Sequence, residues 1–174
     1  MLLFGAAGSI IAGGYGIAHD QVTYSISPEY FTHFKFHQFH YLDLTQPHRL
    51  IVGEIGFLAT FWVGLFSAWF MARITLPHES LPNAARRCAI GVGMIVAAAI
   101  TGGIVGNALA PSDLDSPSAE CFNDLMLQLE ILDRHAFARV GSIHNGGYAG
   151  ALVGLIGSLL WLRLSRKPSR SPIR

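Results

Sequence analysis

Residues 50–74 read LIVGEIGFLATFWVGLFSAWFMARI, and this stretch decides the fold. Its only charged residues are Glu54, near the start, and Arg73, at the end. A helix rises about 1.5 Å per residue, so an apolar stretch of this length crosses the ~30 Å hydrocarbon core of a bilayer. The sequence therefore predicts a membrane-spanning helix here.

Three more apolar stretches follow the same pattern, at about residues 2–18, 89–110 and 143–164. Only 13% of the residues are charged, against about 25% in soluble domains. A signal peptide is the alternative for the first stretch, but no Lys or Arg precedes it, which favours a retained helix. We expect an all-α protein, a four-transmembrane-helix bundle in which residues 1–174 form a single integral membrane domain.

Small residues recur every four positions in three of these stretches, which predicts close helix packing or docking to other membrane subunits. The stripes are Gly5, Ser9 and Gly13 in the first stretch, Ala98, Gly102 and Gly106 in the third, and Gly146, Gly150, Gly154 and Ser158 in the fourth.

Two long polar connections separate the spans, at residues 19–48 and 111–141. In the first, Ser27 followed by Pro28 is typical of a helix start. In the second, Ser116 and Pro117 give the same signal. Leucines and an alanine then recur at helical spacing, and an acidic and a basic residue lie four positions apart. These are Leu125, Leu129, Leu132 and Ala136, with the pair Glu130 and Arg134. We expect an amphipathic extracytoplasmic helix over the bundle mouth.

The distribution of basic residues predicts the orientation, because cytoplasmic loops of membrane proteins are enriched in Lys and Arg. Eight basic residues lie in the loop after the second span and in the tail, namely Arg73, Arg86, Arg87, Arg163, Arg166, Lys167, Arg170 and Arg174. The other four are Lys35, Arg49, Arg134 and Arg139. We expect a multi-pass protein of the inner (cytoplasmic) membrane with both termini cytoplasmic. Seven of eight histidines and ten of eleven acidic residues then lie on the extracytoplasmic side.

Histidines and carboxylates at the predicted extracytoplasmic mouth suggest a metal site, because imidazole and carboxylate ligands suit Zn, Cu and Fe. Our candidate ligands are His19, Glu29, Glu54 and His144. Glu54 is notable because a carboxylate inside a span usually faces a cavity or a partner. The alternative is an interfacial Glu that reaches water or pairs with Arg49.

Other polar residues near these candidates are expected to support or extend the site. Asp20 and Asn145 can hold ligands by hydrogen bonds, and Tyr148 lies one turn from His144. Additional histidines are candidates if their segments fold over the site, although histidines at headgroup level are the alternative. These are His33, His37, His40 and His135.

Three patches resemble a group of uncharacterised small bacterial multispan membrane proteins. The patches are His19-Asp20, then Glu29-Tyr30-Phe31-Thr32, and finally His144-Asn145 before a Gly-rich span. The resemblance covers about a third of the chain and implies no activity. It implies that the three patches converge, and it does not extend to residues 33–48.

The sequence is compatible with three functions. The first is an integral membrane protein with a His/carboxylate metal site, and the second is an accessory subunit of a larger membrane complex. The third is a small transporter or proton relay, which the lack of a proline-broken span disfavours. Whether the protein is an enzyme stays open. The formal net charge of +1 disfavours nucleic-acid binding, so the expected partners are the lipid bilayer and other membrane subunits.

Overall fold

The computed structural model describes residues 1–114 and 120–165, which contain helices and no strand. Four helices are long and apolar enough to cross a membrane: α1 (Leu2–Ile26), α3 (His48–Thr75), α4 (Leu81–Ala108) and α6 (Arg134–Leu164). Three short elements complete the fold: the π-helix η1 (Tyr30–Lys35), α2 (Phe36–Gln38) and α5 (Glu120–Gln128). The predicted all-α bundle of four spans is confirmed.

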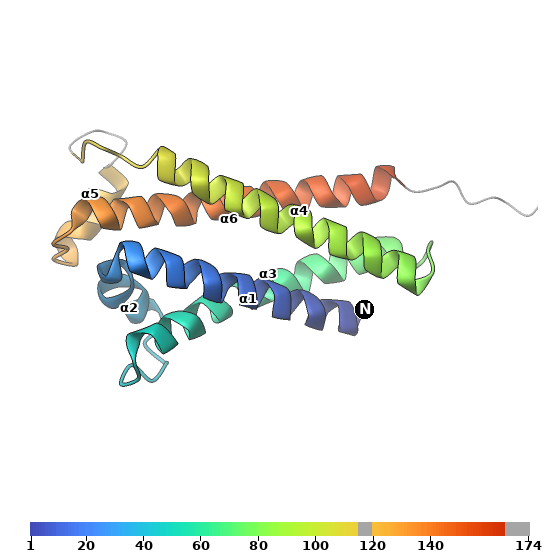
Figure 1. The fold of residues 1–174 in the computed structure, drawn as a ribbon, viewed down its shortest axis with the longest axis horizontal. Coiled ribbons are helices and arrows are strands. Elements are labelled where there is room, and N and C mark those ends of the chain that lie inside the picture. The colour runs from blue at the N-terminus through green and yellow to red at the C-terminus, as the bar shows by residue number, and fades with distance from the viewer. Residues whose placement is uncertain (115–119, 166–174) are drawn as a thin grey trace, which may run out of the picture.

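The bundle consists of two helix pairs, α1 with α3 and α4 with α6, which run along each other over most of their length (Figure 1). Contacts between the pairs are much sparser. Within each pair the backbones touch at glycines: a Cβ on Gly16 would lie 2.0 Å from the Gly56 carbonyl oxygen, and one on Gly102 would lie 2.2 Å from that of Gly146. No side chain fits at these points.

The predicted small-residue stripes of the third and fourth spans are confirmed as the seam between α4 and α6, where a Cβ on Gly150 would lie 2.2 Å from the Ala98 carbonyl oxygen. In α1 the structure differs from the prediction. Of the predicted stripe, Gly13 packs closely against α3, where a Cβ would lie 2.3 Å from the Phe57 ring, but a Cβ on Gly5 would make only ordinary contacts. The backbone contacts with α3 are made by Gly8 and Gly16. Gly8 and Gly16 are separated by a multiple of four residues, like the members of the predicted stripe. The spacing alone therefore did not identify the face of α1 that packs against α3.

The helices extend beyond the predicted apolar stretches. The first connection was predicted to begin at His19, but α1 continues to Ile26. Likewise, α4 begins at Leu81 and α6 at Arg134. Hydropathy marks where a helix is apolar, whereas intrahelical hydrogen bonds determine where it ends. As a result His19 and Asp20 lie within a regular helix rather than in a loop.

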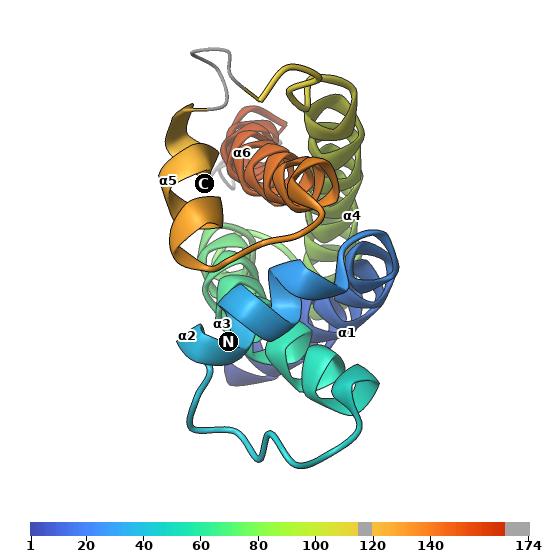
Figure 2. The same cartoon turned by 90° about the vertical axis from the view of Figure 1, so that its left-hand side faces the viewer.

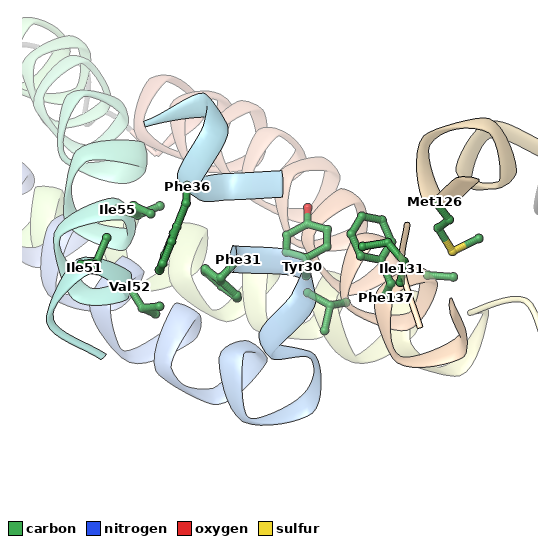
Figure 3. Close-up of a cluster of buried hydrophobic side chains, with 11 residues drawn as sticks. Tyr30, Phe31, Phe36, Ile51, Val52, Ile55, Met126, Ile131 and Phe137 are labelled. Atoms are coloured by element: carbon green, nitrogen blue, oxygen red, sulfur yellow. The ribbon is translucent and has the colours of Figure 1, made fainter. Parts of the chain in front are cut away.

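Residues 27–38 and α5 together form a layer over one end of the bundle, which we call the cap (Figure 2). The largest apolar cluster lies beneath and within it, where aromatic residues of the first segment pack against α3 and against residues of α5 and α6 (Figure 3). Its buried members are Tyr30, Phe31, Phe36, Ile51, Val52, Ile55, Met126, Ile131, Phe137, Ala138 and Val140. The cap therefore joins the two helix pairs at this end.

The amphipathic helix of the second connection is shorter than predicted. It ends at Gln128, and Glu130 adopts a left-handed conformation with φ 53°. The backbone N–H of Ile131 donates to the Met126 carbonyl, and that of Glu130 to the Leu127 carbonyl, the pattern of a Schellman helix end. This end interrupts the predicted periodicity from Leu125 to Ala136. The predicted start at Ser116 and Pro117 lies outside the described residues.

Candidate metal centre

Three potential ligands converge between the helix pairs, just beneath the cap. They are His19 and Asp20 of α1 and His144 of α6, and each offers a ligand atom within 4.8 Å of the other two. Asp20 and His144 are buried, at 5% and 3% exposure, and His19 is half-buried. An ionisable cluster at this depth in an apolar bundle is costly unless its members pair or bind a cation.

The ring of His144 is held in one orientation by its own helix. Its Nδ1 lies 3.0 Å from the carbonyl oxygen of Val140, to which a protonated Nδ1 donates. The other ring nitrogen, Nε2, lies 3.3 Å from Asp20 Oδ1. A backbone carbonyl on one ring nitrogen is a common way for a protein to direct the other nitrogen at a metal.

His19 and Asp20 are neighbours in sequence, and a buried threonine supports them from the next turn. The Thr23 hydroxyl lies 3.1 Å from the His19 carbonyl oxygen and 3.3 Å from that of Asp20. The His19 ring stacks on Tyr15, with ring centroids 5.6 Å apart, and meets His144 edge-on at 4.9 Å. Both rings are therefore restrained by packing against other rings.

Aromatic residues of the cap cover the site. Tyr30 stacks on His144 with ring centroids 5.0 Å apart, and Phe31 contacts the same ring edge-on. Burial raises the pKa of Tyr30, so its hydroxyl stays protonated at neutral pH. Lys35 is also buried, with its ammonium near the rings of Tyr30 and Phe34. Burial lowers the pKa of Lys35, and the negative charge of Asp20 opposes this effect.

A cavity of about 110 Å³ borders the three residues on the side away from the cap. It is lined by His19, Asp20 and His144, by the aromatic Tyr15 and Tyr148, and by small and apolar side chains. A single buried water needs only ~10–15 Å³. The cavity therefore has room for water or a small ligand beside the His and Asp side chains.

The structure leaves the candidate ligands Glu29 and Glu54 outside this group. The Glu29 carboxylate accepts hydrogen bonds from the backbone N–H groups of Leu132 and Asp133, at 3.1 and 2.8 Å. Glu54 faces a separate shallow pocket, which it shares with apolar residues such as Ile17. Glu29 therefore holds the cap to the start of α6.

The remaining candidate site residues do not form a single group with His19, Asp20 and His144. The Nδ1–H of His33 donates to the Leu129 carbonyl oxygen at 3.0 Å, so His33 also holds the cap together. The candidate histidines His37, His40 and His135 are exposed, as is Asn145. Tyr148 lines the cavity, and its ring centroid lies 6.1 Å from that of His144.

Sequence reasoning placed Asp20 in a supporting role and did not single out Tyr15, Tyr30 or Lys35. Sequence signals pointed to the two tyrosines but not to Lys35. Tyr15 precedes His19 by one helical turn, and Tyr30 belongs to the Glu29–Thr32 patch. The convergence of His19 and His144, by contrast, requires α1 and α6 to be side by side at the same height.

Comparisons of the chain with protein-family models, with curated proteins and with solved structures found no match.

Proposed function

We propose that this integral membrane protein binds a divalent transition-metal ion through His19, Asp20 and His144. The observation that carries the proposal is the approach of the three ligand atoms to within 4.8 Å. Supporting it, the Val140 carbonyl orients His144 so that Nε2 points at Asp20. Glu29 and Glu54 are not ligands in this proposal, because the Glu29 carboxylate bonds to backbone N–H groups and Glu54 lines another pocket.

The donor set narrows the choice of metal. Two imidazoles and one carboxylate are found in catalytic zinc sites and in non-haem iron(II) sites, both of which keep positions open for water or substrate. The cavity beside His19 and Asp20 provides space for such a ligand. A metal bound there would supply a Lewis acid or an activated water. We propose zinc or iron, with copper as the less fitting alternative.

Metal analysis of the detergent-purified full-length protein tests the proposal. We expect about one zinc or iron ion per chain in the wild type and a loss of at least tenfold in metal affinity in His144→Gln. His135→Gln is the matched control, because His135 lies on the same helix but is exposed. Equal metal contents in the wild type and in His144→Gln would refute the proposal.

A proton relay is the second candidate, favoured by the direct contact of His144 Nε2 with Asp20 Oδ1 at 3.3 Å. That pair is complete without a metal, and the nearby tyrosines offer further hydrogen-bonding groups. The metal analysis separates the two candidates. A metal-free wild type whose Asp20→Asn variant loses proton flux in liposomes would establish the relay.

A role as an accessory subunit rests on a different surface. Trp62, Phe66 and Phe70 recur every four residues on α3 and are about half exposed. The small-residue stripes of α4 and α6, by contrast, pack against each other, so they are not available to a partner subunit. A partner subunit would therefore bind the aromatic face of α3, and native mass spectrometry of the protein extracted in mild detergent would reveal it.

We also propose that the cap faces the extracytoplasmic side and both termini face the cytoplasm, from the asymmetry of basic residues. Cysteine labelling in whole cells tests this orientation. The natural Cys88 is buried and cannot report on it, so exposed positions are needed. In a chain that also carries Cys121→Ser, Leu44→Cys in the loop beside the cap should react with a membrane-impermeant reagent, and Ser80→Cys at the other end should not. The reverse labelling pattern would show that the protein has the opposite orientation in the membrane.

A further inference from the structure

A long groove runs between α1 and the other helix pair, on the opposite side of His19 from the small cavity. Its volume is about 530 Å³, within the ~300–1,000 Å³ range of ligand pockets. Along α1 it follows one face from Tyr15 to Ile26, and along α4 it extends from Ala99 to Asn107. Most of its lining residues are apolar.

The dimensions of the groove match one leaflet of a bilayer. The distance along α1 from Tyr15 to Ile26 is about 16 Å at ~1.5 Å per residue, close to half of the ~30 Å hydrocarbon core. The groove begins near the middle of α1 and ends at the capped end. A chain lying in it would run parallel to the lipid chains of that leaflet.

The end of the groove nearest the cap carries a positive charge. Arg139 of α6 is exposed and lines the groove there beside Asn107. Its Nε donates to Asn107 Oδ1 at 2.6 Å, which holds the guanidinium over the groove and leaves its other N–H groups for a ligand. Among the described residues no carboxylate forms an ion pair with Arg139.

We propose that this groove is a binding site for a phospholipid with a net anionic headgroup. The phosphate binds the Arg139 guanidinium, which can donate two parallel hydrogen bonds to phosphate oxygens. One acyl chain occupies the groove down to Tyr15 and packs against His19, which borders both the groove and the cavity. The lipid thus covers the cluster on the side of His19, whether or not the cluster binds a metal.

Native mass spectrometry of the full-length protein in detergent, titrated with phosphatidylglycerol or phosphatidylcholine of identical chains, tests the site. We expect the wild type to bind phosphatidylglycerol about fivefold more tightly, since one basic side chain near anionic lipid contributes ~1 kcal/mol. In Arg139→Gln this preference should disappear. Arg86→Gln is the control, because it removes the same charge at the other end of the bundle and should keep the preference.

Filling the groove tests where the chain lies. Ala18→Phe and Val22→Phe place a ring in the groove from exposed positions of α1, so both variants should fold and should lose most binding of both lipids. Ala149→Phe, at an exposed position on α6 away from the groove, should bind like the wild type. The proposal is overturned if the wild type binds both lipids equally, if Arg139→Gln keeps the preference, or if the folded groove variants retain wild-type binding.

Discussion

The seams within the helix pairs and the interface between the pairs are built in opposite ways. Within a pair, backbones touch directly, as where Gly16 meets Gly56 and Gly102 meets Gly146. Between the pairs, side chains keep the helices apart and leave the groove and the small cavity. The polar cluster lies at this looser interface, because only there is there room for two histidines, a carboxylate and a ligand.

The contrast assigns different tasks to the two kinds of contact. Glycine seams fix each pair as a rigid unit, whereas the relative position of the pairs depends on a few groups of side chains. At one end these are the cap and its apolar cluster, and at the other a smaller cluster around Met71, Cys88 and Leu162. Because His19 and Asp20 come from one pair and His144 from the other, the geometry of the site depends on these connections.

The largest effect is expected from filling a seam. Gly150→Leu should lower the free energy of unfolding by about 3 kcal/mol or more, because even its Cβ would lie 2.2 Å from the Ala98 carbonyl oxygen, and overpacking forces the backbones apart. Thermal unfolding in detergent measures the loss. Gly157→Leu on the same helix is the control, since its Cβ would meet no atom within 4 Å. Equal melting of the two variants would show that the seam does not hold the pair together.

The second prediction concerns the interface between the pairs. If the His-Asp-His cluster binds zinc or iron, a free metal concentration of about 100 times Kd should stabilise the folded protein by ~2.7 kcal/mol. A chelator should reverse this, and His144→Gln should abolish it. His37→Gln, which changes an exposed cap histidine, should respond to metal like the wild type. Stabilisation that persists in His144→Gln would place the metal elsewhere.

The third prediction tests the cap as the connection between the pairs. Glu29→Ala removes two acceptors from the backbone N–H groups of Leu132 and Asp133. We expect a loss of about 1–2 kcal/mol, since hydrogen bonds to charged groups contribute ~1.5–3 kcal/mol each and these are partly exposed to water. Glu54→Ala is the control, because Glu54 lies in a separate shallow pocket. The measurement is thermal unfolding, and a larger loss for Glu54→Ala would contradict the assignment.

The spans and the α4–α6 seam were predictable because they depend on local patterns. Hydropathy over residues 50–74 identifies a span, and small residues every four positions place Gly146 and Gly150 on one face. The α1 seam was not predictable in the same way. Gly5, Ser9 and Gly13 form as regular a stripe as Gly8 and Gly16. Only the residues of α3 decide which of them pack closely: Gly13 meets Phe57, and the backbone contacts are made by Gly8 and Gly16.

The site was predictable in part for a related reason. His19 and His144 stood out as polar residues next to apolar stretches, but their approach depends on how the two pairs meet. The role of Glu29 depends on backbone N–H groups more than a hundred residues away. No pattern within the first connection indicates that partner. Long-range backbone hydrogen bonds of this kind leave no trace in spacing or composition.

The smallest expected effect lies at the turn that ends α5. No sequence pattern predicts this turn. Glu130 occupies the left-handed position of the helix end with φ 53°, where glycine is the usual residue. A non-glycine residue there costs ~1 kcal/mol or slightly more, because its Cβ approaches the backbone. Glu130→Gly should therefore raise the free energy of unfolding by up to about 1 kcal/mol, with part of the gain lost to the greater chain entropy of glycine in the unfolded state. Glu130→Ala separates the two possible causes, since it removes the charge but keeps the Cβ. It should melt close to the wild type. If Glu130→Ala stabilises the protein as much as Glu130→Gly, the gain comes from removing the carboxylate, and the turn after α5 is not strained.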